Sequence, residues 1–195
     1  MDTPEESHLH DYIDIVTRST RRMSGLLDDL LRVEEIRTSP AELHVSTNFA
    51  DLVGKVADNL HLLANAKNQR VKMDVRLDGL TNLRVDPMLI REAMENLVAN
   101  AVKYTPEGGE IRLISDYDDW RVRFTVEDTG IGVHADDLPH IFEWGFRSKK
   151  LGDQPVEGKG MGLSLVKSVM DRHRGEVWAE SVEGVGSRFG FWLPR

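Results

Sequence analysis

The chain of 195 residues contains no cysteine, which excludes disulfides, thiolate metal sites and cysteine nucleophiles. It also lacks any apolar run of the roughly 18 residues that a membrane-spanning helix needs, and its acidic first residues are not those of a secretory signal peptide. Positive charge is in deficit: 25 Lys and Arg oppose 33 Asp and Glu, giving a net charge of −8 that argues against a broad nucleic-acid surface. We therefore expect a cytoplasmic chain with no membrane segment and no nucleic-acid partner, although a longer parent protein could be membrane-anchored.

Residues 8–37 form the longest amphipathic pattern in the sequence. Apolar side chains recur there every seven residues, at Leu9, Val16, Met23 and Leu30. This spacing is typical of a coiled coil or a helical bundle. We expect the helix to end before Pro40, because the residue that precedes a proline avoids helical backbone angles. A long helix with so narrow a seam favours one half of a helical hairpin over a helix that merely lies on the main domain.

The rest of the chain mixes helical and strand patterns without an internal repeat. The sequence predicts helices over 49–67, 87–104, 135–143 and 161–174, and strands over 71–77, 82–85, 110–116, 120–128, 176–182 and 187–193. The Asp86-Pro87 pair is a typical helix start, with an N-cap followed by proline in the first helical position. We predict an α+β fold, namely a two-layer sandwich whose mixed, mostly antiparallel sheet carries helices on one face. The long N-terminal helix is additional to it.

The predicted helix 87–104 carries a polar stripe. Glu92, Asn96, Asn100 and Lys103 are spaced by four, four and three residues, so they share one face. Such a stripe is usually solvated surface, but two amides one turn apart between a glutamate and a lysine are unusual. The neutral oxygen of Asn100 suits a hard cation such as Mg²⁺, and Lys103 offers a positive charge to phosphate.

Three glycine-rich segments follow this helix. Asp128–Gly132 ends a predicted strand, where the carboxylate of Asp128 could accept a hydrogen bond from an exocyclic amine such as that of adenine. Gly158–Gly162 opens a predicted helix whose N-terminal N–H groups could bind di- or triphosphate. Taken alone, these segments would be an ordinary turn and a flexible hinge. Together with Gly184–Ser187 and the polar helix, they favour a nucleotide site.

These motifs resemble those of the ATP-binding catalytic domain of sensor histidine kinases, within the gyrase/Hsp90/histidine-kinase/MutL superfamily. The matches are Asn96–Tyr104 with the N box, Asp128–Gly132 with G1, Ile141–Phe146 with the F box, Gly158–Gly162 with G2, and Gly184–Ser187 with the last glycine motif. The resemblance assigns residues 48–195 to this catalytic domain. Residues 1–40 resemble the second helix of the dimerisation and phosphotransfer hairpin, with Met1–Glu6 as the hairpin loop.

The resemblance implies a role for each matched residue. Asn96, Asn100 and Lys103 would be catalytic, with Asn100 as the Mg²⁺ ligand. The implied ATP-binding residues are Asn96, Asn100, Lys103, Tyr104, Asp128, Gly130, Gly132, Phe142, Arg147, Gly158, Lys159, Gly160, Met161, Gly162, Leu163 and Ser187. Residues 144–160 would form a lid over the nucleotide. The implied cofactors are ATP and Mg²⁺.

The resemblance also implies phosphoryl transfer rather than hydrolysis. Hydrolytic members of the superfamily place a glutamate four residues before the metal-binding asparagine. That position is Asn96 here, and an amide cannot take a proton from water. Of the seven histidines, His8 and His10 come nearest to an acceptor motif, but no proline follows them. We therefore expect no phosphoacceptor in this chain, and no autophosphorylation of the chain alone.

The implied partners are the receiver domain of a response regulator, the phosphoacceptor helix of the same kinase, and a second copy that could pair through residues 8–37. Two other functions stay open. One is an anti-sigma-type serine kinase, against which the hairpin-like helix argues. The other is a non-catalytic, ATP-gated interaction module, against which intact Asn100 and Asp128 argue. A hydrolytic ATPase is the least favoured, because of Asn96.

Overall fold

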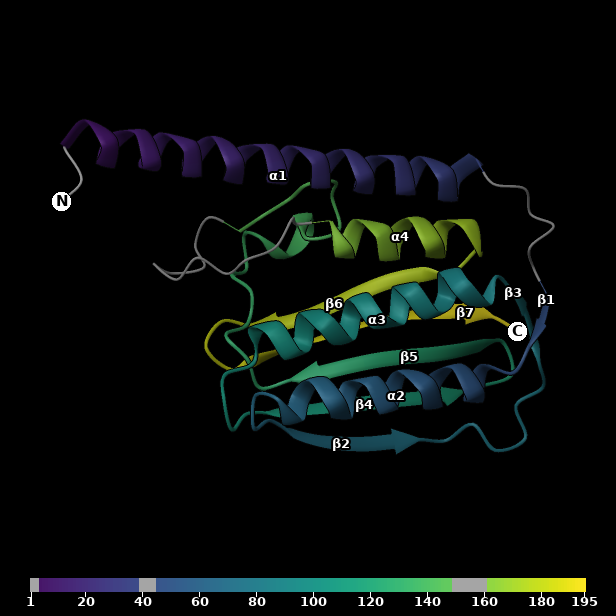
Figure 1. Ribbon diagram of the computed structural model, residues 1–195. Helices are drawn as coiled ribbons and strands as arrows, with labels where there is room; N and C mark the ends of the chain where they lie inside the picture. The colour runs from purple at the N-terminus through teal and green to yellow at the C-terminus, as the bar shows by residue number, and fades with distance from the viewer. Residues whose placement is uncertain (1–3, 39–44, 149–160) are drawn as a thin grey trace.

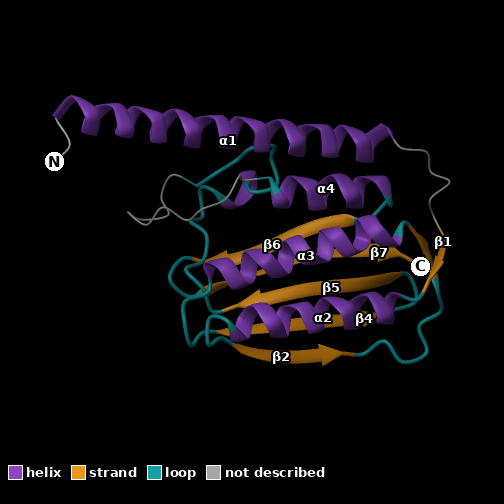
Figure 2. Cartoon of the chain, in the orientation of Figure 1, coloured by secondary structure: helices purple, strands orange, loops and turns teal. Residues whose placement is uncertain are grey.

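The computed structural model describes residues 4–38, 45–148 and 161–195. A five-stranded sheet is covered on one face by three helices, and a fourth, longer helix lies above them (Figures 1 and 2). The predicted α+β sandwich with helices on one face is therefore confirmed.

In the described part of the chain the α-helices are α1 (Pro4–Thr38), α2 (Phe49–Asn65), α3 (Pro87–Tyr104) and α4 (Gly162–Arg172). α1 begins at Pro4, where proline followed by two glutamates suits a helix start, so Pro4–Glu6, which the resemblance implied to be part of a hairpin loop, are helical. The predicted helix 135–143 is wrong, because only a short 3-10 helix forms, η2 (Leu138–His140). Pro139 lies in the middle of that stretch and has no N–H to donate to a preceding turn.

The main sheet has the order β2-β4-β5-β7-β6. Its strands are β2 (Arg70–Val75), β4 (Glu110–Tyr117), β5 (Arg121–Asp128), β7 (Gly186–Pro194) and β6 (Glu176–Val182). β2 pairs with β4 in parallel, and the other neighbours are antiparallel. The predicted strand 82–85 is β3 (Leu83–Val85), but it leaves the main sheet and pairs with β1 (Val45–Thr47), which the sequence did not predict.

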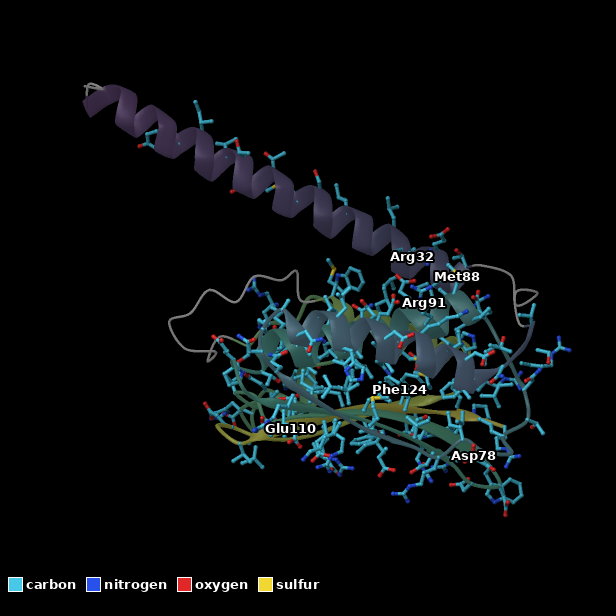
Figure 3. The ribbon with its side chains drawn as sticks, turned by 60° about the horizontal axis from the view of Figure 1, so that its bottom comes forward. Arg32, Asp78, Met88, Arg91, Glu110 and Phe124 are labelled. Atoms are coloured by element: carbon cyan, nitrogen blue, oxygen red, sulfur yellow. The ribbon has the colours of Figure 1, made fainter. Side chains whose placement is uncertain are left out.

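The core lies between the sheet and α2, α3 and α4. Phe124 and Phe191 stack from adjacent strands with ring centroids 5.5 Å apart, and both are fully buried. The end of α1 joins this core through Val33 and Ile36, whereas its upstream residue Met23 is exposed. α1 therefore meets the body through its C-terminal part and projects away from it (Figure 3). None of the helices in these described ranges combines the length and apolarity that crossing a bilayer requires.

The start of α3 is fixed as predicted. The Asp86 carboxylate accepts hydrogen bonds from the N–H groups of Met88 (3.0 Å) and Leu89 (3.2 Å). The N–H of Asp86 itself donates to Nε2 of buried His173 at 3.0 Å. Since Nδ1 of His173 lies 2.7 Å from the Val169 carbonyl, the ring ties α3 to the end of α4. These bonds orient the helix that carries the polar stripe.

Candidate nucleotide-binding site

The polar side of α3 meets the first residue of α4. A Cβ atom on Gly162 would lie 2.6 Å from Oδ1 of Asn96, so only glycine fits here without a shift. The amide nitrogen of Asn96 donates to the carbonyl of Glu92 at 2.9 Å, one turn back on α3. The structure therefore holds the Asn96 amide between its own helix and the N-terminus of α4. Asn100 is half-buried one turn further along α3.

The C-terminal end of α3 meets the segment that follows β5. The Tyr104 carbonyl accepts a hydrogen bond from the N–H of Ile131 at 3.2 Å, and a Cβ atom on Gly130 would lie 2.5 Å from the same oxygen. Lys103 Nζ lies 3.2 Å from the Tyr104 hydroxyl and 4.7 Å from its ring centroid. Both of these candidate residues are half-buried. Their ammonium and phenol groups are thus held together, and the backbone of Tyr104 lies against Gly130.

Two side chains that the sequence did not single out cap this end of α3. Buried Gln69 donates through Nε2 to the carbonyls of Val102 (3.0 Å) and Thr105 (2.7 Å). Lys67 Nζ donates to the Val102 carbonyl at 2.8 Å. The positive charge of Lys67 also suits the negative end of the helix dipole. The turn between α2 and β2 thereby fixes the backbone that carries Lys103.

Asp128, the last residue of β5, is a buried carboxylate with an exposed fraction of only 6%. Burial raises its pKa to about 6, because removal from water disfavours the charged form, while hydrogen bonds from the backbone of Gly130 and Ser187 oppose the shift. The bond from the Gly130 N–H is 2.8 Å long. A carboxylate has about four lone-pair sites, so it can still accept a hydrogen bond from a ligand. The oxygens of Asp128 are thus oriented before any ligand arrives.

The last glycine motif packs directly on Asp128. Gly186 has φ +145°, and a Cβ atom there would lie 2.0 Å from the Asp128 carbonyl oxygen. Asp128 pairs in register with Ser187, which is buried and whose Oγ lies 2.9 Å from Oγ of Ser181. Ser181, which the sequence did not single out, also accepts from the N–H of Val133 at 2.8 Å. β6 and β7 therefore support the end of the candidate site that contains Asp128.

For the remaining candidate residues the structure gives burial and few specific contacts. Met161 is buried at the N-cap of α4 and Leu163 is half-buried in its first turn. Gly132 lies against the carbonyl of Val182. Phe142 is half-buried and Arg147 is exposed, both in the stretch after η2. The candidates Gly158, Lys159 and Gly160, and most of the predicted lid, lie outside the described residues.

These contacts join the motifs into one arrangement. Asn96 meets α4 at one point of α3, and Tyr104 meets Gly130 two turns later, about 12 Å along the helix axis. Asp128 lies two residues from Gly130 and touches Gly186. The site thus has a helix N-terminus suited to an anion near one end and a buried carboxylate near the other. Within the described ranges no group of three His, Cys, Asp or Glu side chains could hold a metal ion.

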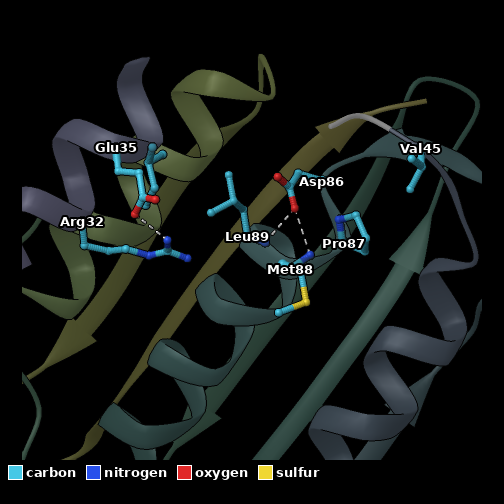
Figure 4. A pocket seen from close by; sticks show the side chains of 8 residues that line it. Arg32, Glu35, Val45, Asp86, Pro87, Met88 and Leu89 are labelled. Atoms are coloured by element: carbon cyan, nitrogen blue, oxygen red, sulfur yellow. Dashed lines mark hydrogen bonds and ion pairs between the residues drawn. The ribbon is translucent and has the colours of Figure 1, made fainter. Parts of the chain in front are cut away.

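A separate pocket lies beside the N-terminal end of α3 (Figure 4). Its lining residues are Arg32, Glu35, Ile36, Val45, Asp86, Pro87, Met88 and Leu89. None of the residues predicted for nucleotide binding is among them.

The fold, the amide-bearing helix, the glycine start of α4 and the buried Asp128 together define an ATP-binding catalytic domain. Residues 85–195 match the family model of histidine kinase-, DNA gyrase B-, and HSP90-like ATPases, and the chain belongs to this family. Within it, the relatives identify the chain as carrying the histidine kinase catalytic domain of a two-component system.

The adaptive-response sensory kinase SasA of Synechococcus sp. (strain JA-3-3Ab) is 39% identical over 178 residues, which cover 89% of this chain and 46% of that protein. Full-length ShkA, solved in complex with AMPPNP, has a TM-score of 0.73 and 27% identity, covering 95% of this chain and 38% of that one. Histidine kinase ThkA, solved in complex with the response regulator protein TrrA, supports the fold with a TM-score of 0.70 at 23% identity, over 100% of this chain and 53% of that one. The chain spans about half the length of the curated relatives that it matches.

Proposed function

We propose that this chain binds ATP with Mg²⁺ and transfers the γ-phosphoryl group to a histidine that lies outside it, for relay to a response regulator. The observation that carries the proposal is the continuous arrangement along α3. Asn96 lies against the first residue of α4, and Tyr104 lies against Gly130, two residues from Asp128. One nucleotide can therefore engage all three elements at once.

Each end of the site suits one part of ATP. The Asp128 carboxylate accepts a hydrogen bond from the adenine amine, and Ser187 and Gly130 hold it in place. The N–H groups of the first turn of α4 and the ammonium of Lys103 receive the phosphates. Phe142, Arg147 and the Gly158–Gly162 segment belong to the same proposed site by their match to the family motifs.

Mg²⁺ fits the donor chemistry of α3. This ion prefers oxygen ligands, keeps several waters and shares its remaining positions with substrate phosphates. Asn100 supplies a neutral amide oxygen on the same helix as Asn96, four residues on. The ion, when bound, neutralises charge on the phosphates, and Asn100 orients it.

The amide side chain of Asn96 favours phosphoryl transfer over hydrolysis of ATP. Its amide nitrogen donates to the Glu92 carbonyl, and an amide cannot act as a general base toward water. Phosphoryl transfer mainly needs positioning and charge neutralisation, which α3 and α4 supply.

The long helix suits the second half of a phosphotransfer hairpin, so we assign residues 1–40 to that part and residues 48–195 to the catalytic domain. Val16, Met23 and Leu30 keep a seven-residue spacing and are all exposed, which leaves an apolar seam for a partner helix or a second copy. The response regulator is proposed by analogy with the ThkA–TrrA complex. We propose that the acceptor histidine lies on the partner helix of the hairpin.

Calorimetric titration of ATP, with and without Mg²⁺, tests the nucleotide site. Asn100→Ala should weaken binding at least about tenfold when Mg²⁺ is present, and change it little when the ion is chelated. Asn59→Ala, on α2, is the matched control and should bind as the wild type does. Equal affinity of the wild type and Asn100→Ala with Mg²⁺ would contradict the assignment of Asn100.

A second assay tests the acceptor. Incubation with ATP should leave this chain unlabelled, and should give acid-labile phosphate when the histidine-bearing hairpin of the same kinase is added. Acid-labile phosphate on His8 or His10 would refute the external acceptor. Acid-stable phosphate on a partner would instead favour the serine-kinase alternative.

A further inference from the structure

The last turns of α1 contact both helices that form the proposed phosphate end of the site. The Arg32 guanidinium makes two bonds to Glu92 on α3, with Nη2–Oε2 at 2.7 Å and Nε–Oε1 at 3.4 Å. On α4, Arg172 donates through Nη1 to the carbonyl of Ile36 at 3.0 Å. Figure 3 places Arg32 where α1 meets the body, near Arg91 on α3.

An apolar contact accompanies these polar ones. Val33 and Ile36 are buried and belong to the hydrophobic core, so the end of α1 is held at a defined position on the body. The Arg32–Glu92 pair lies beside it, with side-chain exposures of 40% and 30%. Because a two-point bond between arginine and carboxylate fixes orientation as well as distance, the pair sets how α1 faces α3.

Glu92 links this contact to the site. Its carbonyl accepts the hydrogen bond from Asn96 Nδ2, and Oδ1 of Asn96 abuts Gly162, where α4 begins. Thus α3 touches α4 at Asn96, and α1 touches α3 one turn before that point, at Glu92, whereas the contact of α1 with α4 lies at Arg172, the last residue of α4. A displacement of α1 therefore acts directly on α3, one turn before its contact with Gly162.

We infer that Arg32 is a positioning residue, which acts through Glu92 to hold α3 against the N-terminus of α4 at the spacing that binds the phosphates of ATP. The position of α1 thereby controls ATP affinity. This inference rests on the proposed function, since it concerns the regulation of that same site. Linkage makes the effect reciprocal, so bound ATP should tighten the docking of α1 by the same factor.

The test is ATP–Mg²⁺ affinity of the full chain, measured by calorimetry at a temperature where every variant is folded. Arg32→Ala and Glu92→Gln should each weaken binding about three- to fivefold, the range set by a partly exposed ion pair. The charge exchange Arg32→Glu with Glu92→Arg should recover at least about half of that loss. Arg91→Ala is the matched control, because it breaks the 2.8 Å Arg91–Glu95 pair, whose two partners both lie on α3, and it should bind as the wild type does.

A distance measurement separates positioning from a general loss of stability. Because the chain has no cysteine, spin labels at Met23→Cys on α1 and His61→Cys on α2 report only this pair. In the otherwise wild-type protein, addition of ATP–Mg²⁺ should narrow the distribution of distances between the two labels. In the protein that also carries Arg32→Ala, the same addition should leave that distribution unchanged.

The outcomes are distinct. If the wild type binds ATP and Arg32→Ala binds equally well, the inference is overturned while the proposed function stands. The inference is also overturned if Arg91→Ala weakens binding as much as Arg32→Ala, or if the charge exchange recovers nothing. Failure of the wild type to bind ATP at all would instead remove the proposed function, and the inference with it.

Discussion

Replacement of Asp128 by asparagine should stabilise the folded protein while it removes the contact proposed for adenine. Asp128 is buried, and its ionisation is disfavoured by the loss of water around it. Asparagine keeps an oxygen that can accept the 2.8 Å hydrogen bond from Gly130. It carries no charge, so the cost of a buried negative charge disappears.

The magnitude follows from the pKa. The folded-state pKa of Asp128 is raised from 3.8 to about 6, which corresponds to about 3 kcal/mol at 1.36 kcal/mol for each pKa unit. Since the folded pKa lies above the unfolded one, the stabilising contribution of the protonated group is complete below pH 3.8 and is lost as the pH rises through about 6. Asp128→Asn should therefore gain stability relative to the wild type across this window, by up to about 3 kcal/mol above pH 7.

Urea unfolding of both proteins between pH 4 and pH 8 measures this difference, because the other titrating groups are common to the pair and cancel. Calorimetry at pH 7.5 should show that Asp128→Asn has lost the preference for ATP over GTP. A difference in unfolding free energy that does not grow with pH would refute the argument from burial. Unchanged nucleotide preference would refute the place of Asp128 in the adenine pocket.

Two stability predictions test the packing around the site, each by urea unfolding against a matched control. Gly186→Ala should cost about 3 kcal/mol or more, because the new Cβ would lie 2.0 Å from the Asp128 carbonyl oxygen. Gly184→Ala, which has φ +75° but open space around it, should cost only about 1 kcal/mol of backbone strain. His173→Leu should cost about 2 kcal/mol, because the N–H of Asp86 loses its buried acceptor. His61→Leu on the exposed face of α2 should change stability by less than about 0.5 kcal/mol, and equal losses at His173 and His61 would contradict this role.

Most of the fold could be predicted because its elements carry strong local patterns. The helix start at Asp86, the alternation of β5 and the seven-residue spacing in α1 are all local signals. β1 has only three residues, too few for any periodic pattern, and its pairing with β3 depends on tertiary contacts. The parallel pairing of β2 with β4 also joins strands far apart in the chain, which adjacency in sequence could not indicate.

The candidate site shows the same division between local patterns, which could be predicted, and contacts between elements, which could not. Residues on one helix face could be grouped from spacing alone, because helix geometry fixes their relation. Gln69, Ser181 and the Arg32–Glu92 pair were not predicted, since each acts across elements and none has a motif of its own. A lone glutamine after a helix or an arginine in an amphipathic helix resembles any solvated residue until its partner is known.

The glycine motifs illustrate why their two interpretations, as turns or as ligand contacts, are compatible. Gly130 and Gly186 each lie where a side chain would collide with a backbone carbonyl of another element, at Tyr104 and at Asp128. Their first effect is therefore on packing: they let α3, β5 and β7 approach closely enough to bury the Asp128 carboxylate. That burial produces both the raised pKa and the oriented acceptor. The residues that close the core thus also build the base pocket, so a substitution such as Gly186→Ala should lower stability and nucleotide preference together, whereas Asp128→Asn should separate them.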